Sequence, residues 1–282
     1  MSDPNNTMGN SGNGQSSNQK RDNDDFTGFS LGSTKTCALD GASLLRAVGD
    51  VSHKMSAAHS PEICDMVGVS AQTLLKAVID GDRKFLSAMV DQLLDKNIGL
   101  DMLYDQLLLP VSADLNEMWR DDRIGFVDVE MATARLQMMC NLFAIRFSAT
   151  QHKVDTAKRI ILARVRGERH ALGLSIVEVF FRHAGWIVDG GTSLETSSAF
   201  YGQIKEVHYD VVGISVGAAT VADVSDTISH IRSSSFNDNV KIALGGPAIA
   251  CNPRNYLPAG ADLLTADIKT AVERVNLLLA AG

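Results

Sequence analysis

The sequence predicts an N-terminal helical bundle followed by a parallel sheet with helices on both faces, an α + α/β architecture. At roughly 150 residues per domain, 282 residues suffice for two domains. From about residue 40 to residue 150, apolar residues recur at i, i+3 and i+4, the spacing of helices that bury one face. Beyond about residue 158, short β-branched segments alternate with helical ones, which indicates a parallel α/β sheet.

Residues 1–35 are expected to form a disordered tail. They are mainly Asn, Ser, Gly, Gln and Asp, and such a segment buries too little apolar surface to offset the entropy lost on ordering. No basic segment followed by an apolar one marks a signal peptide, and no apolar stretch approaches the roughly 18–20 residues of a membrane helix. We therefore expect a cytoplasmic protein with no membrane partner.

Residues 36–150 are expected to form the bundle, with four or five helices. The clearest pattern lies at residues 82–96, where apolar residues share one helical face and Asp82 is a candidate N-cap. Further helices are expected at residues 71–79, 100–109 and 129–147, the second of them ended by Pro110.

Residues 158–282 are expected to form the sheet domain, with five strands. The expected strands are residues 159–165, 186–189, 211–215, 240–244 and 262–265, and the helices between and after them are residues 172–184, 194–208, 221–233 and 267–280. In such a sheet, ligands bind beyond the carboxyl ends of the strands. The loops at residues 166–171, 190–193, 215–220 and 245–250 are therefore the expected binding loops.

Charge and motif content exclude several classes of function. The net charge is −7 and no basic run is longer than Lys20-Arg21, so tight autonomous DNA binding is not expected. There is no HExxH, P-loop or GxGxxG motif, which argues against the common metalloproteases, P-loop NTPases and dinucleotide enzymes. The cysteines are scattered without a metal-binding spacing and are expected to be reduced, packed thiols: Cys37, Cys64, Cys140 and Cys251.

Three short motifs fall at the ends of expected strands. They are Glu168-x-His170-x-x-Gly173, Ser215-x-Gly217 and Gly245-Gly246. Between the first and second motifs lie 41 residues, and between the second and third lie 27. Each motif alone is a weak signal, but the three motifs and the two intervals between them form one combined pattern. The combination resembles the cobalamin-binding module, which has the pattern DxHxxG, SxL and GG on a flavodoxin-like sheet. The resemblance covers residues 158–282.

The resemblance implies a role for each motif residue. Neutral imidazole is a good ligand for cobalt, so His170 would replace the dimethylbenzimidazole of cobalamin as lower axial ligand. Glu168 would accept a hydrogen bond from the other ring nitrogen of His170. Ser215 would hydrogen-bond the displaced benzimidazole, and Gly245 and Gly246 would let the nucleotide tail approach the backbone.

Two motif positions depart from the pattern of the module. Glu168 stands where Asp is usual, so its carboxylate reaches one methylene further. Gly217 replaces the Leu of SxL, which removes an apolar wall beside the tail.

Within the bundle, a further stretch resembles the W…EH signature of methionine-synthase-like caps and adenosylcobalamin photoreceptors. Trp119 and Glu130 match, although their separation is one residue longer, and Met131 stands where His would be. The resemblance implies that these residues cover the upper face of the corrin. The alternative is that Trp119 anchors the core of the bundle. Other candidate upper ligands are His53, His59 and His152.

The complete arrangement resembles the AerR/PpaA group of purple photosynthetic bacteria. That resemblance implies a sensor rather than an enzyme, a light- and redox-responsive antirepressor that binds adenosylcobalamin or hydroxocobalamin. Such a protein binds a PpsR/CrtJ-type repressor of photosystem genes. Three alternatives remain open: a corrinoid carrier of a methyltransferase system, a heme sensor with His170 on the iron, and a partner-binding domain without a cofactor.

Overall fold

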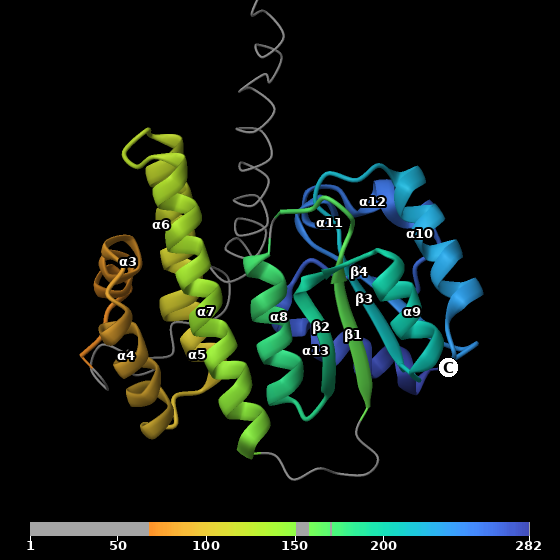
Figure 1. Cartoon of the computed structure of the whole chain (residues 1–282), viewed down its shortest axis with the longest axis horizontal. Coiled ribbons are helices and arrows are strands. Elements are labelled where there is room, and N and C mark those ends of the chain that lie inside the picture. Colours follow the sequence, from red (N-terminus) through yellow and green to blue (C-terminus); the bar gives the residue numbers. More distant parts are fainter. Residues whose placement is uncertain (1–67, 151–157, 170, 282) are drawn as a thin grey trace, which may run out of the picture.

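The computed structural model describes residues 68–150, 158–169 and 171–281. The expected tail, the first part of the expected bundle and the candidate ligands His53, His59, His152 and His170 lie outside the described residues. Within them, a helical part precedes a five-stranded parallel sheet, so the predicted fold class is confirmed (Figure 1).

The described part of the bundle is built from short and long helices that bury one apolar face each. Asp82 is the N-cap of α4, as predicted, since its carboxylate accepts the backbone N–H of Phe85 at 3.0 Å. The helices are α3 (Ala71–Asp80), α4 (Arg83–Asp95), α5 (Leu100–Leu103), α6 (Leu109–Arg120) and α7 (Phe126–Thr150).

The prediction that Pro110 ends a helix is wrong. A π-helical turn, η1 (Tyr104–Leu108), joins α5 to α6, and the N–H of Leu109 donates to the carbonyl of Tyr104. Pro110 then lies in the first turn of α6. A proline has no N–H to donate, but the π turn shifts the hydrogen-bond register so that none is required there. The helical run therefore continues to Arg120.

The sheet has the order β2-β1-β3-β4-β5, and every neighbouring pair is parallel. This order places the first strand of the domain next to the centre, with the chain turning outward on both sides of it. The strands are β1 (Arg159–Arg164), β2 (Ile187–Glu195), β3 (Val211–Ser215), β4 (Lys241–Gly245) and β5 (Leu263–Leu264).

The second strand is longer than predicted, and residues 190–193 belong to it rather than to a loop. The pairing with β1 shifts register, because Leu162 pairs with Gly190 but Arg164 pairs with Glu195. Gly190 has φ +80°, and a Cβ there would lie 2.3 Å from the carbonyl oxygen of Leu162. The Gly-Gly pair therefore marks an irregularity inside the strand instead of a turn. Consequently α9 (Ser198–Glu206) begins later than predicted.

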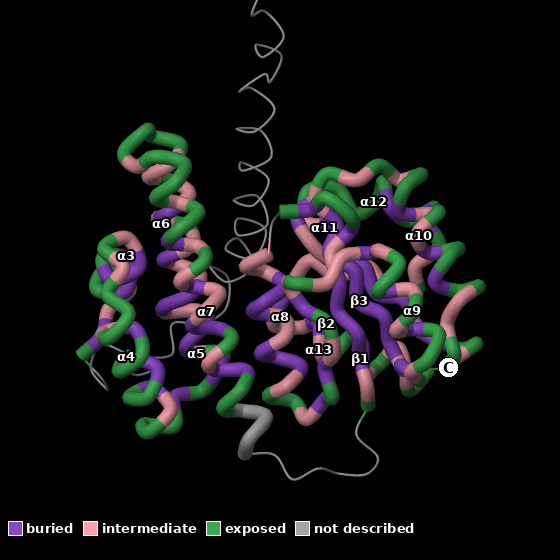
Figure 2. Tube along the Cα trace, in the orientation of Figure 1, coloured by how far each residue is buried: buried purple, intermediate pink, exposed green. Residues whose placement is uncertain are grey.

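Helices cover both faces of the sheet (Figure 1). One face packs against α8 (Leu172–His183) and α13 (Ile268–Ala280). The other packs against α9, α10 (Val221–Ser234), α11 (Pro247–Cys251), α12 (Pro253–Tyr256) and the short η2 (Leu257–Ala259). Figure 2 shows the resulting buried stretches along β1 and β3. None of the described helices has both the length and the apolarity needed to cross a membrane.

The bundle and the sheet domain share one core. The buried residues of the bundle are continuous with Ile176 and Phe180 of α8, and the ring of Tyr104 meets that of Phe180 edge-on at 5.9 Å. An ion pair of 2.8 Å joins Asp105 to Lys269 of α13. Cys140 is fully buried here, and burial raises the pKa of its thiol to about 12, in accord with the prediction of a packed thiol. For Cys251 that prediction is wrong, because the residue is exposed at the end of a short surface helix, and Cys37 and Cys64 lie outside the described residues.

Candidate functional site

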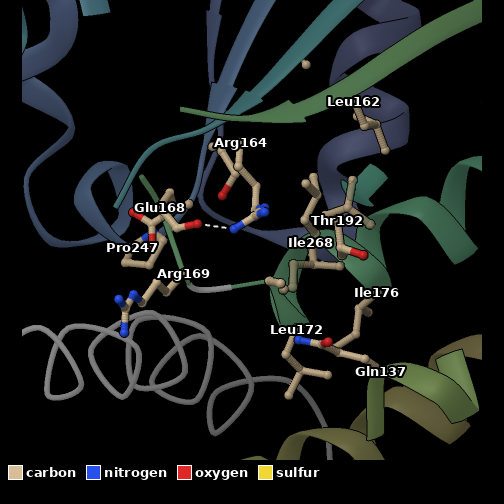
Figure 3. Close-up of a pocket in the computed structure, with 18 of the residues that line it drawn as sticks. Gln137, Leu162, Arg164, Glu168, Arg169, Leu172, Ile176, Thr192, Pro247 and Ile268 are labelled. Carbon is tan, nitrogen blue, oxygen red and sulfur yellow. Dashed lines mark hydrogen bonds between the residues drawn. The ribbon is translucent and has the colours of Figure 1, made fainter. Parts of the chain in front are cut away.

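A cavity of about 850 Å³ lies between the bundle and the carboxyl ends of β1, β3 and β4. Small-molecule sites usually measure about 300–1,000 Å³, so this one is large enough for an extended ligand. Figure 3 shows Gln137 of α7 beside Leu172 and Ile176 of α8, with Arg164 and Glu168 across the cavity from them. The two parts of the fold therefore build one site together.

Most of the residues predicted from the sequence line this cavity. They are Trp119, Glu130, Glu168, Gly173, Ser215, Gly245 and Gly246. Gly217 and Met131 are not among the lining residues, and the Met131 side chain is 47% exposed. His170 lies outside the described residues, but both of its chain neighbours, Arg169 and Ala171, line the cavity.

The side chain of Glu168 is held at the end of the neighbouring strand. It is buried, and its Oε2 accepts the backbone N–H of Ala218 at 3.1 Å. A Cβ atom placed on Gly217 would lie only 1.3 Å from this oxygen. The space left by the missing Leu side chain is therefore filled by the longer carboxylate of Glu168.

Sequence analysis did not identify Arg164, the last residue of β1. Its guanidinium donates to the backbone carbonyl of Glu168 and, at 3.2 Å, to the carboxylate of Glu195 on β2. The other carboxylate oxygen of Glu195 accepts the backbone N–H of Gly167 at 3.4 Å. This pair of charges thus fixes the loop that leads to His170. A charged residue ending an apolar strand was a visible signal, but its partner, 31 residues later, was not.

We expect Arg164→Met to destabilise the protein by about 1–3 kcal/mol, because it removes two donors and leaves Glu195 without its cation. The matched control is Arg159→Met at the opposite end of the same strand, where the ion pair with Asp189 is longer, at 3.7 Å, and its arginine side chain is 39% exposed. Urea unfolding measures both. Equal destabilisation by the two variants would contradict the bracing role of Arg164.

Of the two glycines at the end of β4, Gly246 is required by the packing of the chain itself. Gly246 has φ +97°, and a Cβ there would lie 2.7 Å from the backbone nitrogen and oxygen of Val216 and 2.8 Å from Oγ of Ser215. A Cβ on Gly245 would lie 3.1 Å from the carbonyl oxygen of Thr265. Close approach of a ligand is thus not needed to explain Gly246, whereas a shift of a few tenths of an ångström would make room for a Cβ at Gly245.

Gly173 differs from the other motif glycines. It is the second residue of α8 and lines the cavity, and a Cβ placed on it meets no heavy atom of the described residues within 4 Å. The absence of a side chain here keeps space open in the cavity without serving a contact within the protein.

The bundle contributes a row of polar residues to the cavity from α7. Glu130, Thr133 and Gln137 recur at helical spacing and line it together. Met131 lies about 100° from Glu130 around the helix, on the side away from Val129, and does not line the cavity. Trp119, on α6, is only partly buried, lines the cavity and is absent from the buried core of the bundle. Thr133 and Gln137 were not identified from the sequence, although their spacing was a usable signal.

Comparisons with known proteins give one family match in each part of the chain. A family model described as a B12 binding domain matches residues 158–275, and a second model with the same description matches residues 70–142. A corrinoid protein of Desulfitobacterium hafniense (strain Y51) is 24% identical over 213 residues, which are 73% of this chain and 95% of the relative.

Two further relatives come from other organisms. An uncharacterized 20.5 kDa protein in the bchF-crtJ intergenic region of Rhodobacter capsulatus is 24% identical over 200 residues, 68% of this chain and 100% of the relative. The solved structure of the Methanosarcina barkeri monomethylamine corrinoid protein has a TM-score of 0.53 at 13% identity, covering 74% of this chain and 96% of that one. Each of the two parts of the chain thus matches a B12 binding domain model, and the fold of the chain is similar to that of a corrinoid protein.

Proposed function

We propose that the protein binds a cobalamin in the cavity between its bundle and its sheet. The observation that carries the proposal is that the three spaced motifs meet there, since Glu168, Gly173, Ser215 and Gly245 all line the same cavity. His170 would supply the lower axial ligand from the loop between Arg169 and Ala171. Ser215, which is buried at the end of β3, would hydrogen-bond the displaced tail.

The residues that line the cavity suit a large macrocycle with polar edges. Leu162, Leu172 and Ile176 provide apolar surface beside the sheet, and Trp119 provides an aromatic wall on the bundle side. Amide and hydroxyl groups of Gln137, Asn116, Ser112 and Thr133 stand among them and can pair with amide side chains of a corrin. When bound, an alkylcobalamin supplies a light-sensitive cobalt–carbon bond.

We expect His170→Ala to remove the protein nitrogen from the lower face of the bound cofactor. The measurement is the electron paramagnetic resonance spectrum of cobalamin in the Co(II) state, bound to ¹⁵N-labelled protein. A single ¹⁵N ligand splits the cobalt lines into doublets, whereas the natural ¹⁴N of a retained benzimidazole gives triplets. The control is His183→Ala, at the exposed end of α8. Triplets in the labelled wild type would contradict ligation by His170.

For the biological role, we propose a light- and redox-responsive antirepressor that binds a PpsR/CrtJ-type repressor. The relative named for the bchF-crtJ intergenic region supports this role and aligns over its whole length. The shared core supports this role too. A bundle that is fixed on α8 and α13 would keep the upper face of a bound corrin covered, as we expect of a sensor. A change of ligand in the cavity would then reach the surface through α7, with an energy difference of a few kcal/mol.

A corrinoid carrier for methyl transfer is the second candidate, supported by the corrinoid proteins among the relatives. The two roles differ in what light and methyl donors do. For a sensor, illumination of the adenosylcobalamin-loaded protein changes its affinity for a purified CrtJ-type repressor by about tenfold or more. For a carrier, the reduced protein passes methyl groups from a methylated donor to an acceptor, and illumination leaves repressor affinity unchanged.

A further inference from the structure

The loop after β1 and the turn after β3 are joined by one buried side chain. Glu168 lies in the first and reaches Ala218 in the second, 50 residues later, where its Oε2 accepts a backbone N–H at 3.1 Å. Only 6% of Glu168 is exposed. A buried carboxylate carries a high cost unless donors satisfy it, so this contact constrains both segments.

The backbone of Glu168 is fixed as well. Its N–H donates to the carbonyl of Val165 at 3.0 Å, and its own carbonyl accepts from the guanidinium of Arg164. With the main chain held from both sides, the side chain cannot move away as a unit with the loop. An atom added at Gly217 therefore turns the carboxylate away by rotation of the Glu168 side chain, which breaks its contact with the N–H of Ala218.

The space between the two segments admits only one of two side chains. A Cβ on Gly217 would lie 1.3 Å from Oε2, 2.1 Å from Cδ and 2.6 Å from Oε1 of Glu168. We propose that Glu168 and Gly217 are a matched pair, in which the carboxylate takes the place of a side chain at position 217 and fastens the loop after β1 to the end of β3.

The pair has a consequence for the cavity. Glu168 and Ala218 both line it, and they stand between the loop that leads to His170 and the strand end that carries Ser215. The carboxylate thus fixes the distance between the loop that leads to His170 and the strand end that carries Ser215. The proposed function assigns both of these residues to the lower side of the bound cobalamin. The effect of the pair on cobalamin affinity rests on that proposed function, whereas its effect on stability does not.

A double-mutant cycle tests the pair, with Gly217→Ala, Glu168→Asp and the two together. Gly217→Ala expels the carboxylate, and Glu168→Asp withdraws it and leaves the N–H of Ala218 without this acceptor. We expect each single change to lower the Tm of the cofactor-free protein by about 5 °C or more. The double variant conserves the total volume, so we expect recovery of more than half of the larger loss.

The same cycle is measured for hydroxocobalamin and for cobinamide, which lacks the nucleotide tail. Each single variant is expected to lose about tenfold in affinity for hydroxocobalamin, and the double variant to come within about threefold of the wild type. Gly202→Ala is the matched control, because a Cβ on this exposed glycine of α9 meets none of the described residues within 4 Å.

The outcomes distinguish a failure of the matched pair from a failure of the proposed cobalamin binding. Additive losses of Tm in the cycle would overturn the pair, whether or not cobalamin binds. A strongly non-additive cycle in a protein that binds neither corrinoid would support the pair and contradict the proposed function.

Discussion

Gly173→Leu is expected to weaken cobalamin binding by about 100-fold or more while leaving the protein as stable as the wild type or more so. Within the part of the chain that the structure describes, a Cβ at Gly173 meets no heavy atom within 4 Å, and the new side chain extends from a residue that lines the cavity. Leu is also the better helix former, by up to about 1 kcal/mol. The variant therefore blocks the site without disturbing the fold.

The control for this variant is Gly202→Leu in α9. There, too, an added Cβ would meet no atom within 4 Å in the described ranges of the chain. Both variants are compared by equilibrium titration with hydroxocobalamin and by thermal unfolding. If Gly173→Leu binds cobalamin as tightly as Gly202→Leu, the ligand does not occupy the part of the cavity beside the start of α8.

Gly246→Val is expected to destabilise the protein by more than about 3 kcal/mol. Its φ of +97° is unfavourable for a β-branched residue, which costs about 1–3 kcal/mol. In addition, the new Cβ would lie 2.7 Å from backbone atoms of Val216, and a strand end cannot yield as a flexible side chain would. Much of the folded protein is expected to be lost before any ligand is added.

Gly260→Val is the control for the cost of placing a β-branched residue at a positive φ. Gly260 also has a positive φ, +88°, but its Cβ would meet only Ile228, at an ordinary 3.9 Å. Urea unfolding is expected to show a loss at Gly246 that exceeds the loss at Gly260 by about 2 kcal/mol. Equal losses would mean that the collision with Val216 is relieved. With unequal losses, a binding defect of Gly246→Val says nothing about the tail of the ligand.

The order of elements and the topology of the sheet were predictable, because alternation of β-branched and helical segments leaves few arrangements for a parallel sheet. The positions of the motifs at strand ends followed from the same pattern. The end of β2 was not predictable in this way, since Gly190 and Gly191 suit a turn as well as an irregular strand. Pairing with Leu162 and Arg164 of β1 decides between the two.

The candidate site was predictable as a set of residues but not as a set of contacts. Glu168 and Gly217 were each recognisable as departures from a pattern, yet their complementarity depends on the approach of two loops in space. The brace between Arg164 and Glu195 likewise depends on the register of β1 with β2. The helix end predicted at Pro110 was wrong because the π turn before it leaves no hydrogen bond that needs the N–H of residue 110. The local sequence gives no sign of such a turn.

The most direct test of the account is the amount of cobalamin that the full-length protein retains. The protein is mixed in the dark with adenosylcobalamin or hydroxocobalamin, desalted, and its absorption spectrum is recorded, with Gly173→Leu and a hemin-treated sample alongside. We predict about one cobalamin per chain in the wild type, little in Gly173→Leu and no stable hemin. A wild-type protein that leaves the column without cobalamin would contradict the proposed function, and retention of hemin alone would assign the cavity to heme.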